Sequence, residues 1–178
     1  MSKKYISLII PVPQMESIIQ DYRFKYDFFA KKGIPSHITL IYKMDLKIFN
    51  KYKNEILCLL RAAVNNLSKK KITATKIKRN DNLLFIQLNK NNVDFLKALQ
   101  TLLFEYLDQK SIPLYDNHYD EPHITIFTGK NNPGWEKANM ITKNINSKLP
   151  KHFNINKIWI LEIDKKKNKA DILYSISK

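Results

Sequence analysis

Two short segments of the chain carry the same histidine and threonine pattern. Residues SHITLIY contain His37 and Thr39, and residues PHITIFT contain His123 and Thr125. Side chains alternate across a β-strand, so each histidine shares a face with the threonine two residues later. If the two strands lie side by side, the four side chains converge on one cleft.

These residue types can act together on a phosphodiester. An imidazole has an ordinary pKa near 6.5, so in one site at neutral pH one ring can be neutral and the other protonated. That pair supplies a general base and a general acid. Two threonine hydroxyls can donate hydrogen bonds to the non-bridging oxygens of a phosphate between them. Neither role needs a metal, and we expect no cofactor.

The duplication separates this pattern from a chance match. A single H-x-T-x occurs often by chance, and there the histidine simply begins a strand while the threonine follows β-propensity. Here the two copies are 86 residues apart, and each follows a helix and a proline-containing loop. The repeated context favours a functional pair over two unrelated strand starts.

The rest of the chain predicts elements that would bring the copies together. The order strand, helix, loop, His-Ile-Thr strand, helix occurs from residues 5 to 67 and again from 83 to 149. This repeat predicts two similar lobes packed around a pseudo-twofold axis in a single domain over residues 1–178. The expected elements are strands at 5–10, 37–43, 71–78, 83–88, 123–128, 153–163 and 170–176, and helices at 14–32, 45–67, 91–109 and 135–149.

The composition of the chain indicates which class of partner it binds. The chain has 178 residues, 31 Lys plus Arg and 16 Asp plus Glu, which gives a net charge of +15. Such a charge favours anionic partners, nucleic acid first. The alternative is a Lys-rich surface that follows from an AT-rich genome and keeps the protein soluble. The single cysteine, Cys58, excludes an internal disulfide and a Cys-rich zinc site, and its apolar neighbours predict a buried thiol.

No segment resembles a membrane anchor. The start of the chain has two lysines before apolar residues, but the apolar run is short and Pro11 and Pro13 interrupt it. No stretch approaches the roughly 18 apolar residues of a spanning helix. We therefore expect a cytoplasmic monomer without a membrane partner.

The paired motifs, their spacing and the order of elements resemble the 2H phosphoesterase superfamily, which includes the LigT-like 2′-5′ RNA ligases and RNA 2′,3′-cyclic phosphodiesterases. The resemblance covers essentially the whole chain. It implies a bilobal α+β fold in which two antiparallel sheets, flanked by helices, surround a central positive cleft. It also implies that His123 is the base and His37 the acid, and that Thr39 and Thr125 bind phosphate.

Three further residues are candidates for substrate binding. LigT-like proteins often carry an Arg shortly after the second motif, whereas here Lys130 is the only nearby cation. Tyr42 could stack on a base, although packing is an equally good explanation. Arg23 could bind a second phosphate, with an ordinary helix-face charge as the alternative.

The sequence therefore predicts a metal-independent phosphodiesterase. Its expected substrate is a 2′,3′-cyclic phosphate or a 2′-5′-type phosphodiester of RNA or an oligonucleotide, which it would hydrolyse or reversibly ligate. One alternative is hydrolysis of a cyclic nucleotide or signalling oligonucleotide, as in 2H proteins that counter nucleotide-based immunity. The other is a basic RNA-binding module with little activity, in which the histidine strands are only a scaffold.

Overall fold

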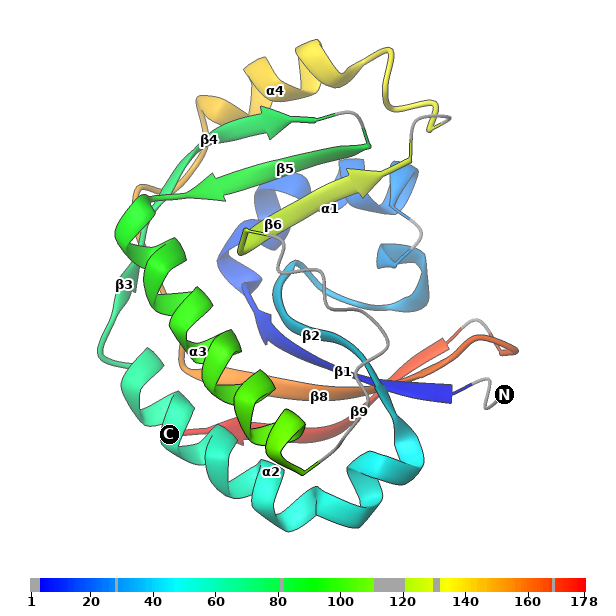
Figure 1. Cartoon of the computed structure of the whole chain (residues 1–178). Coiled ribbons are helices and arrows are strands. Elements are labelled where there is room, and N and C mark those ends of the chain that lie inside the picture. The colour runs from blue at the N-terminus through cyan, green and yellow to red at the C-terminus, as the bar shows by residue number, and fades with distance from the viewer. Residues whose placement is uncertain (1–3, 28, 81, 111–120, 130–131, 168) are drawn as a thin grey trace.

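Both His-Ile-Thr strands lie inside one seven-stranded antiparallel sheet (Figure 1). The computed structural model describes the chain apart from residues 1–3, 28, 81, 111–120, 130–131 and 168. The strand order in the sheet is β4-β5-β6-β2-β1-β8-β9, and β3 and β7 form a separate pair. The strands are β1 (Lys4–Pro11), β2 (His37–Asp45), β3 (Lys71–Ile72), β4 (Ala74–Arg79), β5 (Leu83–Leu88), β6 (His123–Thr128), β7 (Phe153–Asn154), β8 (Lys157–Asp164) and β9 (Lys169–Ser177).

The large sheet consists of two halves that meet at the motif strands. Strands β2 and β6 pair through Ile38 and Ile124 alone, whereas every other neighbouring pair has an extended register. One half is β4-β5-β6 and the other is β2-β1-β8-β9. The expected bilobal α+β architecture is confirmed, with the sheets of the two lobes joined edge to edge at this one pair.

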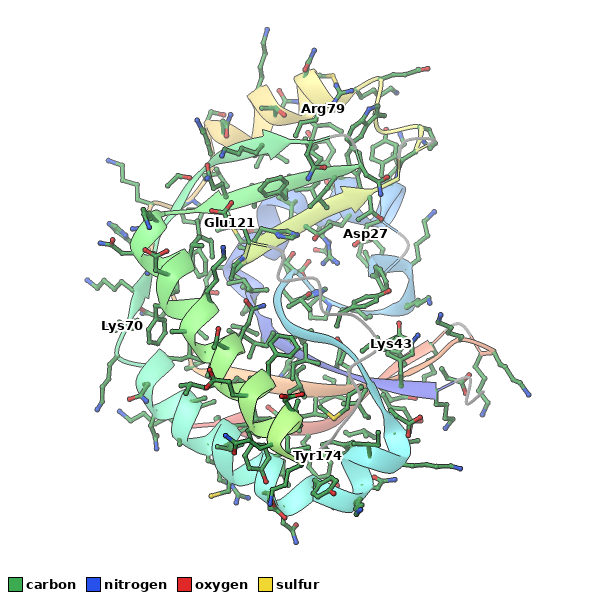
Figure 2. All side chains as sticks on the ribbon, viewed as in Figure 1. Asp27, Lys43, Lys70, Arg79, Glu121 and Tyr174 are labelled. Carbon is green, nitrogen blue, oxygen red and sulfur yellow. The ribbon has the colours of Figure 1, made fainter. Side chains whose placement is uncertain are left out.

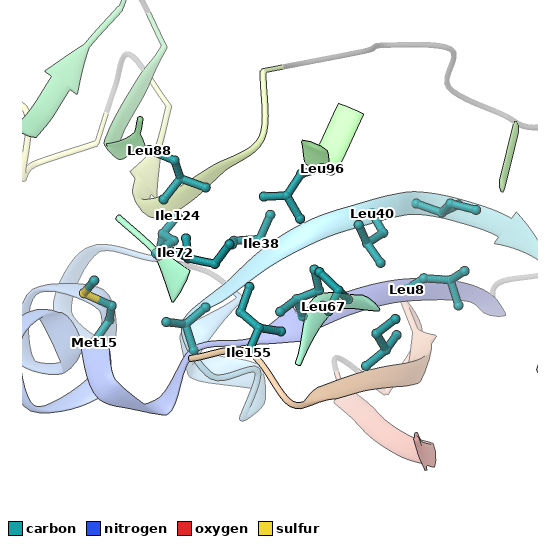
Figure 3. Packing of buried hydrophobic residues seen from close by; sticks show 14 of the residues in the cluster. Leu8, Met15, Ile38, Leu40, Leu67, Ile72, Leu88, Leu96, Ile124 and Ile155 are labelled. Atoms are coloured by element: carbon teal, nitrogen blue, oxygen red, sulfur yellow. The ribbon is translucent and has the colours of Figure 1, made fainter. Parts of the chain in front are cut away.

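A row of five isoleucines holds the halves together on the core face. Cross-strand pairing joins Ile10 to Ile38, Ile38 to Ile124, Ile124 to Ile86 and Ile86 to Ile77. All five are buried, and Figure 3 shows Ile38 and Ile124 within this packing. Burial of each side chain contributes about 1.5–3 kcal/mol. Because strand side chains alternate, the residues flanking these isoleucines face the opposite side of the sheet.

The helices cross between the halves. The four helices are α1 (Glu16–Tyr26), α2 (Leu46–Leu67), α3 (Lys90–Gln109) and α4 (Ala138–Asn146). Helix α1 connects β1 to β2 but packs against β6, and α3 connects β5 to β6 but packs against β2. This reciprocal arrangement is the pseudo-twofold relation that the sequence repeat predicted, and it fixes both motif strands from the opposite lobe.

The first helix is shorter than the 14–32 segment expected from its apolar spacing. A 3₁₀ turn at Pro13–Met15 precedes α1, which ends at Tyr26, and a second 3₁₀ turn covers Ala30–Lys32. The break lies at Asp27, whose backbone is extended and whose carboxylate accepts hydrogen bonds from the Phe29 amide and from Arg23. Such a side-chain acceptor competes with continuation of the helix.

Two other expectations need correction. Helix α4 covers only Ala138–Asn146 of the expected 135–149 segment. Cys58 is exposed, not buried, because the apolar face of α2 is formed by its neighbours in the helical repeat and Cys58 points away from it.

Among the described residues, no helix is both long enough and apolar enough to cross a membrane.

Candidate active site

The register at the junction brings the four motif residues together. Since Ile38 lies opposite Ile124 in an antiparallel pair, His37 is level with Thr125, and Thr39 is level with His123. The two histidines are therefore diagonal neighbours on the two strands, and the Cα atoms of such a pair are expected to lie about 7–8 Å apart. All four side chains line one cavity of about 290 Å³. The convergence that the motif spacing predicts is present in the structure.

Both imidazoles are held by the same backbone contact. Nδ1 of His37 lies 2.8 Å from the carbonyl oxygen of Pro35, and Nδ1 of His123 lies 2.6 Å from that of Glu121. A carbonyl oxygen only accepts, so each Nδ1 carries a proton and donates it. The neutral rings therefore present an unprotonated Nε2, which is the atom able to take a proton from a substrate or a water molecule.

The surroundings of His37 lower its pKa to about 4. Burial is the largest cause, Arg23 and His123 act in the same direction, and the hydrogen bond to Pro35 opposes them. The imidazole is therefore neutral at pH 7 in the substrate-free protein. A neutral ring with its Nε2 unprotonated has the properties of a general base.

His123 is positioned by an aromatic neighbour in the other half of the sheet. Its ring centroid lies 5.0 Å from that of Phe85, with the two planes tilted by 58°. Phe85 comes from β5, where it pairs with Thr125 of β6. The ring of His123 is therefore packed on one side, and the residue is half-buried, as His37 is.

Arg23 is neither a helix-face charge nor part of the cavity wall. It is 1% exposed, and its guanidinium contacts Asp27 at 2.8 Å, Glu16 at 3.6 Å and the hydroxyl of Ser36 at 3.4 Å. Ser36 directly precedes His37, and its amide donates a hydrogen bond to Glu16. Arg23 thus joins α1 to the residue before His37, while its partner Asp27 lines the cavity (Figure 2 labels Asp27).

The two remaining candidates for substrate binding are Tyr42 and Lys130. Tyr42 lines the cavity and is 44% exposed, which leaves its ring available to a ligand at the rim. Its ring contacts those of Tyr5 and Phe29. Lys130 lies outside the described residues.

Gln100 of α3 is a cavity residue that sequence reasoning missed. Strand β2 continues to Asp45, but it pairs with β6 only at Ile38, and Gln100 contacts it just beyond that point. The Nε2 of Gln100 donates to the carbonyls of Thr39 and Leu40 at 3.1 and 3.4 Å. Its buried Oε1 has no hydrogen-bond partner in the described protein. A glutamine within the apolar stripe of the helix, between Leu96 and Leu103, was the signal that could have identified it.

The remaining cavity wall contains many apolar side chains, and they come from both halves of the sheet. Strands β1 and β8 and the segment after α1 provide side chains that suit the face of a sugar or a base: Ile9, Phe29, Ile34, Leu161 and Ile163. Strand β5 and helix α3 add Leu83 and Phe104. The described residues include no cluster of three or more His, Cys, Asp or Glu side chains that could hold a metal ion. Besides the two imidazoles and the two threonine hydroxyls, the polar residues that line this cavity include Ser7, Asp27 and Glu121.

No model of a known protein family matches the chain, and no curated protein sequence matches it. Solved structures do. The E. coli LigT structure in complex with NADP+ aligns with a TM-score of 0.54 at 12% identity, over 99% of this chain and 98% of that one. Usb1 from Kluyveromyces marxianus with uridine monophosphate aligns with a TM-score of 0.53 at 10% identity, over 98% and 97% of the two chains.

A further structure, described as a phosphoesterase, aligns with a TM-score of 0.51 at 12% identity, over 98% of this chain and 99% of that one. The alignments cover nearly the whole length of each chain, so the likeness extends to the whole architecture and not to one sheet alone. The fold expected from the two His-Ile-Thr strands is confirmed: the chain has the bilobal α+β fold of the 2H phosphoesterases.

Proposed function

We propose that the protein is a metal-independent 2H phosphoesterase that acts on a 2′,3′-cyclic phosphate or a 2′-5′-type phosphodiester of RNA or an oligonucleotide. The observation that carries the proposal is the convergence of His37, Thr39, His123 and Thr125 on one cavity. The fold supports it, because the LigT and Usb1 structures that share it were solved with nucleotides bound.

We assign the base to His37, which reverses the assignment that the family resemblance implied. Its lowered pKa keeps it neutral, and its Nδ1 contact with Pro35 leaves Nε2 unprotonated. In hydrolysis of a cyclic phosphate, this Nε2 takes a proton from water as the water oxygen forms its bond to phosphorus.

His123 then acts as the acid. Its protonated Nε2 gives a proton to the ribose oxygen as the bond between that oxygen and phosphorus breaks. The two histidines lie on the diagonal of the four-residue site, so they can serve the entering and the leaving oxygen on opposite sides of phosphorus. Ligation is the same exchange in reverse, with a ribose hydroxyl in place of water.

Thr39 and Thr125 occupy the other diagonal. Their hydroxyls can donate to the two non-bridging oxygens, where negative charge increases in the transition state. The apolar wall beside Tyr42 suits the sugar and base attached to the reacting phosphate. Each part of the proposed substrate then has a counterpart in the cavity.

The test is product analysis with a panel of substrates in the presence of EDTA. The panel contains an RNA oligonucleotide ending in a 2′,3′-cyclic phosphate, a 2′-5′-linked oligonucleotide and a cyclic dinucleotide. We expect turnover of the first or second with EDTA present, and none by the His37→Ala/His123→Ala double variant. Activity that disappears on chelation and returns with a divalent ion would contradict the proposal. So would RNA binding by the wild type without turnover of any substrate.

A further inference from the structure

The catalytic residues are the inner part of two longer rows of side chains. On β5, Gln87 pairs with His123 and Phe85 pairs with Thr125. On β4, Lys76 pairs with Gln87 and Lys78 pairs with Phe85. All of these residues share the face opposite the isoleucine row. In the order β4, β5, β6, β2, the two rows are Lys76, Gln87, His123, Thr39 and Lys78, Phe85, Thr125, His37.

The outer part of these rows is open to solvent. Lys76 and Lys78 are exposed, and Phe85 is half-buried. Their neighbours Ile77 and Ile86 point to the other side and are buried there, and α4 packs against β4. Neither lysine forms a salt bridge with a carboxylate of the described chain. This face therefore places an aromatic ring beside that of His123 and two cations on the next strand out.

The arrangement excludes the reacting phosphate itself as the partner of the lysines. Strand β4 lies two interstrand spacings from β6, which is about 10 Å. A ligand must therefore extend beyond the scissile group to reach Lys76 or Lys78. Single-stranded nucleic acid has the matching chemistry, because its bases stack on aromatic rings and its phosphates pair with lysines regardless of sequence.

We propose that the exposed face of β4 and β5 binds the nucleotides that adjoin the reacting phosphate of a single-stranded RNA. Phe85 stacks with a base, and Lys76 and Lys78 bind backbone phosphates. This deepens the proposed function and rests on it, since it selects an RNA end over a small cyclic nucleotide as the substrate. We call residues Lys76, Lys78, Phe85 and Gln87 the RNA platform.

The test measures the KM of a long and a short substrate for two double variants, one that removes two platform lysines and one that removes two lysines elsewhere. The platform variant is Lys76→Gln/Lys78→Gln. The matched control is Lys143→Gln/Lys148→Gln, which removes two exposed lysines on and after α4. The substrates are a tetranucleotide ending in a 2′,3′-cyclic phosphate and a 2′,3′-cyclic mononucleotide. We expect the platform variant to raise the KM of the tetranucleotide and leave that of the mononucleotide unchanged.

The salt dependence of RNA binding gives the expected size of the effect. Each phosphate contact on a single strand contributes about 0.7 to the slope of log K against log salt concentration. Loss of two contacts should therefore reduce the magnitude of this slope by about 1.4. The control variant should keep the wild-type slope. An equal rise in KM for both substrates, or the same loss in the control, would overturn the platform.

Binding alone separates this proposal from the proposed activity. Fluorescence anisotropy with a labelled tetranucleotide ending in a 3′-phosphate needs no turnover. Phe85→Leu keeps an apolar side chain and should weaken this binding by about 5- to 150-fold, the effect of losing one stacked base. If the variants weaken binding but the wild type turns over nothing, the platform stands and the activity fails. If the wild type turns over substrate and the variants bind the tetranucleotide as tightly as the wild type does, the platform proposal fails and the proposed activity stands.

Discussion

The two motif strands have nearly the same sequence and the same backbone contact, yet their histidines lie in different surroundings. His37 is half-buried near the ion pair of Arg23 and Asp27, and its pKa is lowered to about 4. His123 packs against Phe85 at the edge of an open, lysine-bearing face. The duplicated motif therefore places two equivalent imidazoles in one cavity, and the two lobes give them different neighbours.

The largest expected effect comes from removing either histidine. His37→Ala or His123→Ala should reduce kcat/KM on a cyclic-phosphate substrate by about 10²–10⁴-fold, the usual range for one general acid or base. The double variant should lose much less than the product of the two single losses, because the residues act as a unit. Steady-state kinetics on the three variants measure this. A single variant with wild-type turnover would remove that histidine from the mechanism.

The Arg23 ion pair is the main structural difference between the two sides. Arg23→Met leaves Asp27 and Glu16 without their cation, and loss of one partner of a buried pair costs about 3–5 kcal/mol. It should also raise the pKa of His37, since Arg23 helps to lower it. Denaturant unfolding and an NMR titration of the ring measure the two effects. If Arg23→Met is as stable as wild type and only weakens substrate binding, Arg23 contacts substrate instead.

The threonines test whether the site is symmetric. Thr39→Ala and Thr125→Ala should each cost about 1.5–3 kcal/mol of transition-state stabilisation, as expected for a hydrogen bond to a charged group. We expect the loss in kcat and not in thermal stability, because both side chains line the cavity. Serine at either position retains the hydroxyl and serves as the control. A serine variant as slow as the alanine variant would show that the methyl group, and so packing, is what matters.

Stability against pH reports the enclosure of His37 without any substrate. Its pKa is lower in the folded chain than the ordinary 6.5, so the unfolded chain binds the proton first as the pH falls. The contribution to stability is complete above pH 6.5 and decreases toward pH 4. Between pH 7 and pH 5 we expect a loss of about 2 kcal/mol. His37→Gln should lack this component, and an unchanged pH dependence in that variant would mean that His37 is not buried as described.

The sequence predicted those parts of the site that follow from local alternation. His37 with Thr39 and His123 with Thr125 share faces because a strand alternates, and the duplicated order of elements implied that the copies meet. Gln100 could not be predicted in this way, since its role depends on where the pairing of β2 with β6 ends. The end of α1 at Asp27 has a similar cause, because the carboxylate that stops the helix also binds a buried arginine.

The environment of each histidine is likewise a tertiary property. Nothing in the residues His-Ile-Thr-Leu indicates that the pKa of His37 is lowered to about 4. That shift comes mainly from burial and is increased by Arg23, whereas the neighbour that packs on the ring of His123 is Phe85 of β5. Composition indicated an anionic partner, but the place where Lys76 and Lys78 join the catalytic rows depends on the strand register.

The pH dependence of kcat/KM on a 2′,3′-cyclic phosphate substrate tests the central claim most directly. If one imidazole must be neutral and the other protonated, the profile is bell-shaped, and its two limbs belong to the coupled pair. The base limb should disappear in His37→Ala and the acid limb in His123→Ala, measured on their residual activity. A flat wild-type profile, or a bell that survives both substitutions, would contradict acid–base catalysis by His37 and His123.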